Sequence, residues 1–181
     1  MNINRLCSYF GGVLEFVRDV QTENGVYKKG TYVRVTPAIL YLVATNVIDS
    51  EKDFKLHLRT LSQLENSEIV ELCKMCVPES KNKLLDFPKV SRNGFAEQFT
   101  IEVHIDNETS FLINSIFDLA VCEKMDFGGQ LVTTFRSVVN QAKAVEWALG
   151  KHLDIFYLIP KGKAFGRQNW NLEDYERDPL K

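Results

Sequence analysis

Cysteine is scarce in this sequence. Only four of its 181 residues are cysteine, and their spacing is uneven: Cys7, Cys73, Cys76 and Cys122. Small secreted proteins that depend on disulfides carry cysteines in regular frameworks. We therefore expect reduced thiols and an intracellular location.

Long apolar runs are also missing. The most apolar stretch, residues 37–48, is shorter than the about 20 residues that span a bilayer. Near the N-terminus, Arg5 precedes a segment that Ser8, Gly11-Gly12 and Glu15 interrupt, whereas a signal peptide needs a continuous apolar region. We expect neither a membrane span nor a signal peptide.

The sequence has no excess of charge of one sign. Lysine and arginine number 22, aspartate and glutamate number 24, and the formal net charge is -2. Such a balance gives no global attraction to nucleic acid or to an anionic membrane. Any site for a polyanion would have to be a local patch.

Apolar material for a core is plentiful. Hydrophobic residues make up 45% of the chain and aromatic residues 11%, and this length is ordinary for one domain. We predict a single α+β domain over residues 1–170. Residues 171–181 are mainly charged and polar, so we expect a frayed tail there.

The first 20 residues carry two competing signals. Apolar residues recur at helical spacing over 3–20, but Gly11-Gly12 weakens a helix by about 1 kcal/mol per glycine. A helix over 3–10 followed by a strand over 13–20 is the alternative.

The next segment begins with a turn. Asn24-Gly25 within residues 21–25 favours a tight turn, and β-forming residues predict a strand over 26–35. Thr36-Pro37 favours the start of a helix over 37–45. A strand remains open there, because Ile39, Tyr41 and Val43 alternate.

The middle of the chain predicts a strand, a helix and a long connection. Apolar residues alternate over 54–61 with Lys55, His57 and Arg59, which is the period of a half-buried strand. A helix should run from residue 65 or 66 to 76. Prolines and polar residues predict an irregular connection over 77–96.

The last part predicts a hairpin and two helices. Strands over 98–105 and 109–114 should pair across residues 106–108. We expect helices over 115–125 and 134–149, the second with Lys143 exposed and one buried apolar stripe: Phe135, Val138, Val139, Ala142, Val145 and Leu149. The whole pattern predicts an antiparallel or mixed sheet of five or six strands with about four helices.

Two short segments resemble a known group of proteins. Residues 56–64 read L-H-L-R-T-L-S-Q-L, and residues 152–164 read H-L-D-I-F-Y-L-I-P-K-G-K-A. They resemble uncharacterised small proteins of phages and mobile elements of gut bacteria, which often show L-R-x-L-S-D-L and H-x-D-x-x-x-L-I-x-K-G-x-A. Gln63 stands where aspartate is usual there, and Tyr157 stands where glycine is common.

The resemblance implies an origin in a phage or mobile element. It implies a location in the cytoplasm, which is the host cytoplasm if a phage encodes the chain, or in the virion. No activity is attached to either motif. Physically, the first motif predicts a strand entering a capped helix, and the second predicts a helix exit that packs apolar residues onto a sheet.

A Cys-x-x-Cys pair is the sharpest candidate for metal chemistry. Cys73 and Cys76 could hold zinc if two further ligands converged on them. They share a helical stripe with Ile69 and Leu72, and the chain has no second pair at zinc-ribbon spacing. We predict that both thiols are buried and bind no metal.

A basic and aromatic patch is the main candidate for binding. Its residues are Lys161, Lys163, Phe165, Arg167 and Trp170, and no acidic residue lies between Pro160 and Asn171. Such side chains can pair with phosphates and stack on bases, or anchor a protein partner. The structural alternative is a solvated loop whose rings cover a sheet edge.

These observations favour a non-enzymatic accessory or protein-interaction protein whose partner is another protein. The patch supports a nucleic-acid-binding protein as an alternative. A small hydrolase or metal enzyme is a further alternative, because the scattered cysteines and histidines could converge in space. We predict no cofactor, no catalytic residue and no membrane partner.

Overall fold

The computed structural model describes residues 3–77, 89–95, 98–127, 130–137 and 140–166. The chain divides into two compact units: unit 1 is Met1–Thr60 with Leu149–Lys181, and unit 2 is Leu61–Ala148. The single domain over 1–170 stays a prediction. The expected tail, 171–181, lies outside the described residues.

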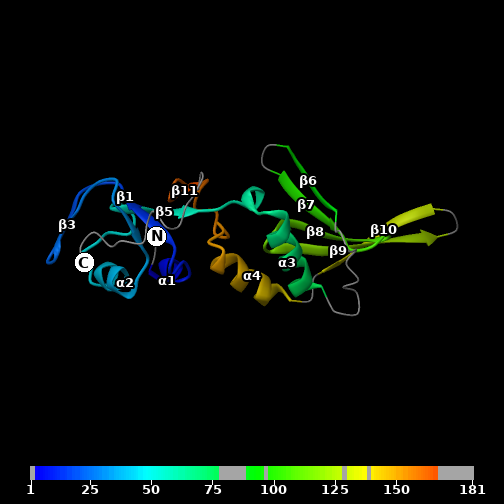
Figure 1. Ribbon diagram of the computed structural model, residues 1–181, viewed down its shortest axis with the longest axis horizontal. Helices are drawn as coiled ribbons and strands as arrows, with labels where there is room; N and C mark the ends of the chain where they lie inside the picture. The colour runs from blue at the N-terminus through cyan, green and yellow to red at the C-terminus, as the bar shows by residue number, and fades with distance from the viewer. Residues whose placement is uncertain (1–2, 78–88, 96–97, 128–129, 138–139, 167–181) are drawn as a thin grey trace. The chain divides into compact units, whose positions relative to one another are not determined.

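Unit 1 is built on a four-stranded mixed sheet with the order β11-β5-β1-β4. Its strands are β1 (Val13–Phe16), β4 (Tyr32–Arg34), β5 (Phe54–Leu58) and β11 (Ala164–Gly166). Strand β1 pairs antiparallel with β4 and β5, whereas β11 runs parallel to β5. The C-terminal part of unit 1 therefore returns to the sheet formed by its N-terminal part (Figure 1).

One face of this sheet forms the core of unit 1. Helix α1 (Ile3–Cys7) and helix α2 (Pro37–Ala44) contribute Leu6 and Ile39 to the cluster that contains Leu14 and Leu56 of the sheet. The hairpin of β2 (Val20–Thr22) and β3 (Gly25–Tyr27) joins the same core through a stacked pair, Phe16 and Tyr27, whose ring centroids lie 4.5 Å apart.

Local signals explain several elements of unit 1. The Thr36 side chain accepts a hydrogen bond from the Ile39 amide at 3.4 Å, and Pro37 begins α2, so the helix prediction is confirmed and the strand alternative is wrong. Near the N-terminus the helix-then-strand alternative is confirmed, because Gly11 takes a φ of 77° after α1. Such a positive φ is incompatible with continuing the helix.

The continuous strand expected over 26–35 is wrong. The chain turns between β3 and β4, where Gly30 has a φ of 81°. Asp19 holds this turn by accepting hydrogen bonds from the Lys29 amide and the Lys28 ammonium, each at 2.8 Å. The predicted turn within 21–25 is confirmed, because β2 and β3 pair as an antiparallel hairpin.

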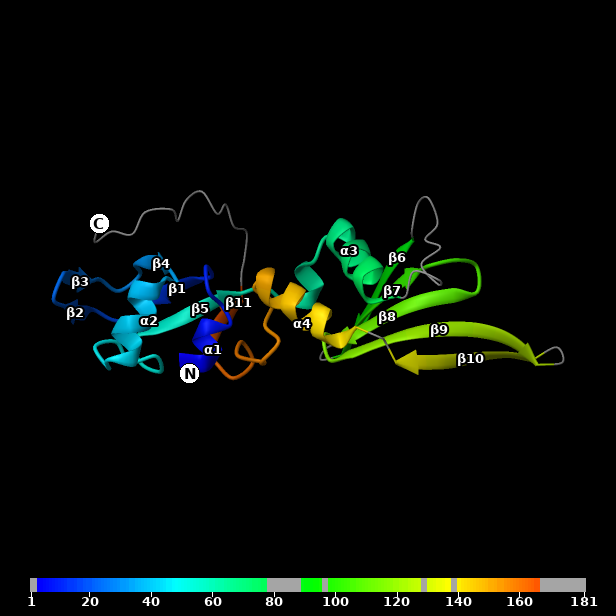
Figure 2. The same ribbon diagram turned by 90° about the horizontal axis from the view of Figure 1, so that it is seen from below.

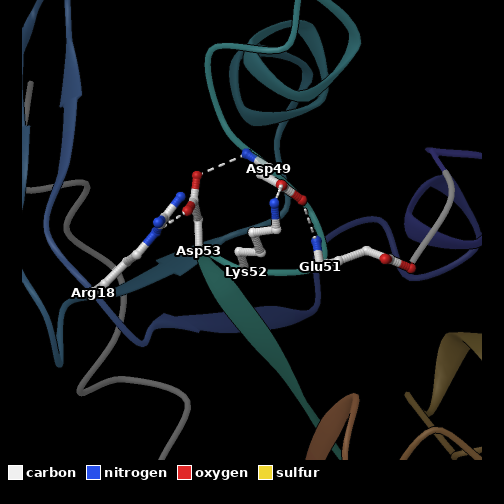
Figure 3. A network of polar contacts seen from close by, with 5 residues as sticks. All are labelled: Arg18, Asp49, Glu51, Lys52 and Asp53. Carbon is white, nitrogen blue, oxygen red and sulfur yellow. Dashed lines mark hydrogen bonds and ion pairs between the residues drawn. The ribbon is translucent and has the colours of Figure 1, made fainter.

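A polar network fixes the connection between α2 and β5 (Figure 3). Buried Asp53 accepts hydrogen bonds from the Arg18 guanidinium and, at 2.7 Å, from the Asp49 amide. Asp49 in turn accepts a hydrogen bond from the Glu51 amide at 2.9 Å. Arg18 follows β1, so the network ties the start of β5 to the end of its neighbouring strand.

Unit 2 is built on a five-stranded antiparallel sheet with the order β10-β9-β8-β7-β6. Its strands are β6 (Val90–Phe95), β7 (Gln98–His104), β8 (Thr109–Ser115), β9 (Asp118–Phe127) and β10 (Gln130–Ser137). The short helix η1 (Leu61–Gln63) leads into α3 (Asn66–Cys76), which packs against β7. Helix α4 (Gln141–Gly150) follows β10 (Figure 2).

The core of unit 2 confirms three of the predicted elements. Ile69 and Leu72 of α3 are fully buried, as are Ile101 of β7 and Phe111 of β8. The predicted helix ending at residue 76 and the predicted β7-β8 hairpin are thus confirmed. In unit 1, the strand predicted over 54–61 is present as β5 over the shorter range Phe54–Leu58, where burial alternates from residue to residue.

Three other predictions for unit 2 are wrong. Residues 115–125 form most of β9 instead of a helix, and residues 90–95 of the expected irregular connection form β6. The expected helix over 134–149 begins only at Gln141, because residues 130–137 form β10. Apolar residues in these segments fit both the helical and the strand period, and pairing with distant strands decides between them.

The register of α4 also differs from the prediction. Ala142, expected in the buried stripe, is exposed, whereas Ala144 and Ala148 are buried. Lys143 is exposed, as predicted. Phe135 belongs to β10, and Val138 and Val139 lie outside the described residues.

The α+β class is confirmed. The described residues form four α-helices, and their strands divide among a five-stranded antiparallel sheet, a four-stranded mixed sheet and the two-stranded β2-β3 hairpin. Sequence alone predicted a single sheet of five or six strands. Within the described part of the chain, every helix is too short or too polar to cross a membrane.

Candidate functional site

The structure describes three of the five residues predicted to form the binding patch. Lys161 and Lys163 are exposed on the loop before β11, and Phe165 is partly exposed on β11 itself. Lys163 pairs with Glu51 at 3.1 Å, and the Lys161 ammonium donates to the Phe156 carbonyl at 3.3 Å. Arg167 and Trp170 lie outside the described residues.

The loop that carries these lysines is held by Asp154. Its carboxylate accepts hydrogen bonds from the backbone amides of Leu158 and Ile159, both at 2.7 Å. The Asp154 amide donates to the Arg59 carbonyl at 2.9 Å, which anchors the loop beside the end of β5. Leu158 is fully buried in the core of unit 1. The loop therefore has a defined conformation.

Tyr157 is the most exposed residue of this segment that has a large apolar side chain. Its φ is 55°, and 55% of the residue is accessible to solvent. The left-handed region costs a residue with a Cβ roughly 1–2 kcal/mol. Its neighbours Phe156 and Leu158 pack against the core. The loop thus presents an aromatic ring to solvent from a strained backbone position.

Two more aromatic side chains of unit 1 are exposed. Phe10 follows α1 and is 57% exposed, and Tyr41 of α2 is 67% exposed. Tyr9, in contrast, is fully buried. Its hydroxyl donates to the Leu153 carbonyl at 3.1 Å, and its ring contacts Phe156 edge to face. Burial raises the pKa of Tyr9, so its hydroxyl stays a donor at neutral pH.

The face of the unit 1 sheet opposite the core carries a second group of functional side chains. His57 of β5 lies 2.9 Å from Glu15 of β1, measured from Nε2 to Oε2. The imidazole also lies between two aromatic rings, with centroid distances of 5.4 Å to Tyr32 and 5.2 Å to Phe165. We call His57, Glu15, Tyr32, Phe165 and Lys55 the sheet-face cluster.

Cationic groups border the sheet-face cluster. The Lys55 ammonium lies 4.9 Å from the centroid of the Phe165 ring, within cation-π range. Arg34 of β4 has a buried Nε that finds no hydrogen-bond partner among the described residues. Strand alternation places Arg34 and Tyr32 on one face, since Val33 between them is buried. The cluster combines flat rings, one cation and one carboxylate, and Arg34 adds a second cation on the same face.

Sequence reasoning found Phe165 but missed the rest of the sheet-face cluster. The alternation over β5 indicated that Lys55 and His57 share a face, which the structure confirms. Glu15 and Tyr32 gave no such signal, because their place opposite β5 depends on the register of β1 with both neighbours. That register is set by strands that lie far apart in the sequence, so a local pattern does not predict it.

The cysteine pair is buried, as predicted. Cys73 and Cys76 are both inaccessible within unit 2, and burial raises the pKa of Cys73 to about 12 and that of Cys76 to about 11. Thiols with such pKa values are poor nucleophiles at neutral pH. Among the residues that the structure describes, no three His, Cys, Asp or Glu side chains gather in a way that could hold a metal ion.

Comparison of the chain with protein-family models, with curated proteins and with solved structures gives no match.

Proposed function

We propose that the protein is a non-enzymatic accessory or protein-interaction protein of a phage or mobile element, and that Tyr157 anchors its partner protein. The observation that carries this proposal is the combination of exposure and strain at Tyr157. An exposed, strained aromatic residue adds nothing to the core of its own unit. Strain of this kind concentrates at functional positions, and tyrosine is enriched among the residues that dominate protein interfaces.

The surroundings of Tyr157 suit an interface. Its loop is held by Asp154 and by the buried Leu158, so little conformational entropy would be lost on binding. Lys161, exposed on the same loop, would contribute at the rim, where charges affect the rate of association more than the affinity.

The variant Tyr157→Gly separates binding from folding. Glycine accepts a positive φ without strain, and its greater freedom in the unfolded chain offsets that gain, so the free energy of unfolding should change by no more than about 1 kcal/mol. Loss of an interface anchor costs about 2 kcal/mol or more, equivalent to roughly 30-fold in affinity.

The experiment compares tagged wild-type protein with Tyr157→Gly in capture from lysates of cells that carry the element, followed by quantitative mass spectrometry. We expect at least one protein to be captured by the wild type and strongly depleted with Tyr157→Gly. Phe117→Ser is the matched control, because Phe117 is equally exposed but belongs to unit 2. Equal capture by wild type and Tyr157→Gly would contradict the proposal.

A second candidate function is binding of single-stranded nucleic acid at the sheet-face cluster. Tyr32 and Phe165 lie on either side of His57. This arrangement favours nucleic-acid binding, because flat rings on a sheet can stack on bases. Anisotropy of a labelled oligonucleotide at increasing salt tests it. Phe165→Ala should weaken binding at every salt concentration, and Lys55→Ala should reduce the salt dependence. Absence of binding at low salt would rule this function out.

A further inference from the structure

The hairpin of β9 and β10 is longer than the sheet that supports it. Strand β8 pairs with β9 only as far as Thr109 opposite Glu123, and the last backbone bond on that side joins the Lys124 amide to the Glu108 carbonyl at 2.8 Å. Pairing of β9 with β10 continues to Phe127 opposite Gln130. Residues 125–127 and 130–132 therefore extend past β8 as a two-stranded ribbon (Figure 2).

Such a ribbon receives little support from its own unit. A two-stranded hairpin is marginally stable in water, and a third strand is what usually stabilises it. Strand β10 is also the outer strand of the sheet, since within the described residues it pairs with β9 alone. Among the residues that the structure describes, no third strand therefore lies along β10 in this ribbon.

Over residues 130–135, the β10 edge carries none of the devices that usually block strand pairing. Residues 130–135 contain no charged residue and no proline, and pairing with β9 runs without a register shift from Gln130 to Ser137. Natural edge strands are normally protected by lysines, prolines or bulges. At the opposite edge, Arg92 of β6 donates from its guanidinium to the Leu64 carbonyl at 2.7 Å, so the segment after η1 lies against that strand.

We propose that β10 pairs antiparallel with β10 of a second copy of this chain. Pairing of a strand with itself is isologous, so it closes at a dimer. Centred between Thr133 and Thr134, it places residues 130–132 of each copy beside residues 135–137 of the other. Residues 135–137 pair with the part of β9 that β8 supports. Each copy then supplies the third strand that the ribbon of the other lacks.

The charges of β10 fit this register. Arg136 is the one charged residue of β10. In this register it lies opposite Leu131 of the second copy, and that Leu131 pairs with Asp126 of its own β9. Directly opposite residues lie on the same face of a sheet, so Arg136 and the second copy's Asp126 lie in one row, about 10 Å apart across two strand spacings. No like charges face each other. The interface belongs to unit 2 and does not depend on the role of Tyr157.

Sedimentation velocity over a dilution series tests the proposal with the full chain. The wild type should be a dimer that dissociates on dilution, and Thr134→Lys should raise the dimer dissociation constant at least tenfold. Thr134 pairs with Glu123 within its own chain, so the lysine keeps an oppositely charged neighbour there while it protects the edge. Asn93→Lys on β6 is the matched control and should leave the dimer intact.

Hydrogen exchange of the wild type gives a second measurement that needs no variant. Amides of residues 130–137 should exchange more slowly as protein concentration rises, whereas those of residues 90–95 should not change. A wild type that stays monomeric at every concentration overturns the proposal. So does a dimer that a folded Thr134→Lys variant forms equally well, or exchange in residues 130–137 that does not depend on concentration.

Discussion

Asp154 accepts a hydrogen bond from the Leu158 amide at 2.7 Å, and this contact holds the loop formed by much of residues 152–164. His152 has a φ of 55° where the chain leaves α4, and Gly162 has a φ of 67° where the loop turns towards β11. Ala164 is buried opposite Leu56 of β5. These positions therefore shape and anchor the loop that leads into β11.

The first prediction tests the role of Asp154 in the loop. Asp154→Ala removes the acceptor of two backbone amides, and each amide left unsatisfied costs about 1–3 kcal/mol. Urea denaturation should show a lower free energy of unfolding for Asp154→Ala. Asp154→Asn should lose less, because its amide oxygen can still accept a bond. Lys161→Ala, on the same loop, is the control and should be close to wild type.

Position 157 shows how backbone geometry and sequence can disagree. The resemblance in the sequence leads to the expectation of glycine there, and the φ of 55° is one that glycine adopts most easily. In this chain a tyrosine takes that backbone conformation. Sequence alone identified the departure at Tyr157, but its meaning depends on exposure and φ, which only the structure supplies.

The second prediction concerns Asp53, which is buried between the Arg18 guanidinium and the Asp49 amide (Figure 3). Asp53→Ala should lower the free energy of unfolding by about 2–4 kcal/mol, because it removes two bonds to a buried carboxylate and leaves the Asp49 amide unpaired. Lys52→Ala should have little effect, since the Lys52 side chain is exposed and its ion pair with Asp49 is long. Equal melting temperatures for wild type and Asp53→Ala would contradict this role.

The sequence predicted the elements that depend on neighbouring residues, but not those that depend on pairing between distant segments. Thr36-Pro37 and the alternation over β5 are local, and the elements that they predicted are present. Most of β9 and the second half of β10 were predicted as helix, because the stability of these strands comes from pairing with strands elsewhere in the chain. The sheet-face cluster was missed for a related reason, since Glu15 and His57 meet across 42 positions of sequence.

The third prediction concerns thiol reactivity. Cys7 is exposed, whereas Cys73, Cys76 and Cys122 are buried, and burial raises the pKa of all three buried thiols. A disulfide reagent at about pH 8 should therefore modify one thiol quickly in the native protein and all four after denaturation. The variant Cys7→Ser should lose the fast phase. Fast modification of two or more thiols in the native state would show that at least one of the three buried thiols is accessible.

The fourth prediction is the pH dependence that follows from the same thiols. The pKa values of Cys73 and Cys76, about 12 and about 11, lie above the ordinary value of 9.0. The unfolded chain therefore releases these protons at lower pH than the folded one. The contribution of these two buried thiols to the free energy of unfolding is fully present below pH 9 and falls as pH rises towards 11. Cys73→Ala/Cys76→Ala should show a shallower loss of melting temperature over this range than the wild type.

The fifth prediction decides which face of α4 is buried. The continuous helix expected over 134–149 would bury Ala142, whereas α4 buries Ala144 and exposes Ala142. Ala144→Asp would bury an unpaired carboxylate and should cost several kcal/mol. Ala142→Asp should change the free energy of unfolding by no more than about 0.5 kcal/mol, because the residue is exposed in the first turn, where a negative charge is favourable. Both variants make the same chemical change two residues apart, so comparing their urea midpoints isolates burial from helix propensity. The reverse order of stability would mean that α4 buries the face expected from the sequence, which includes Ala142.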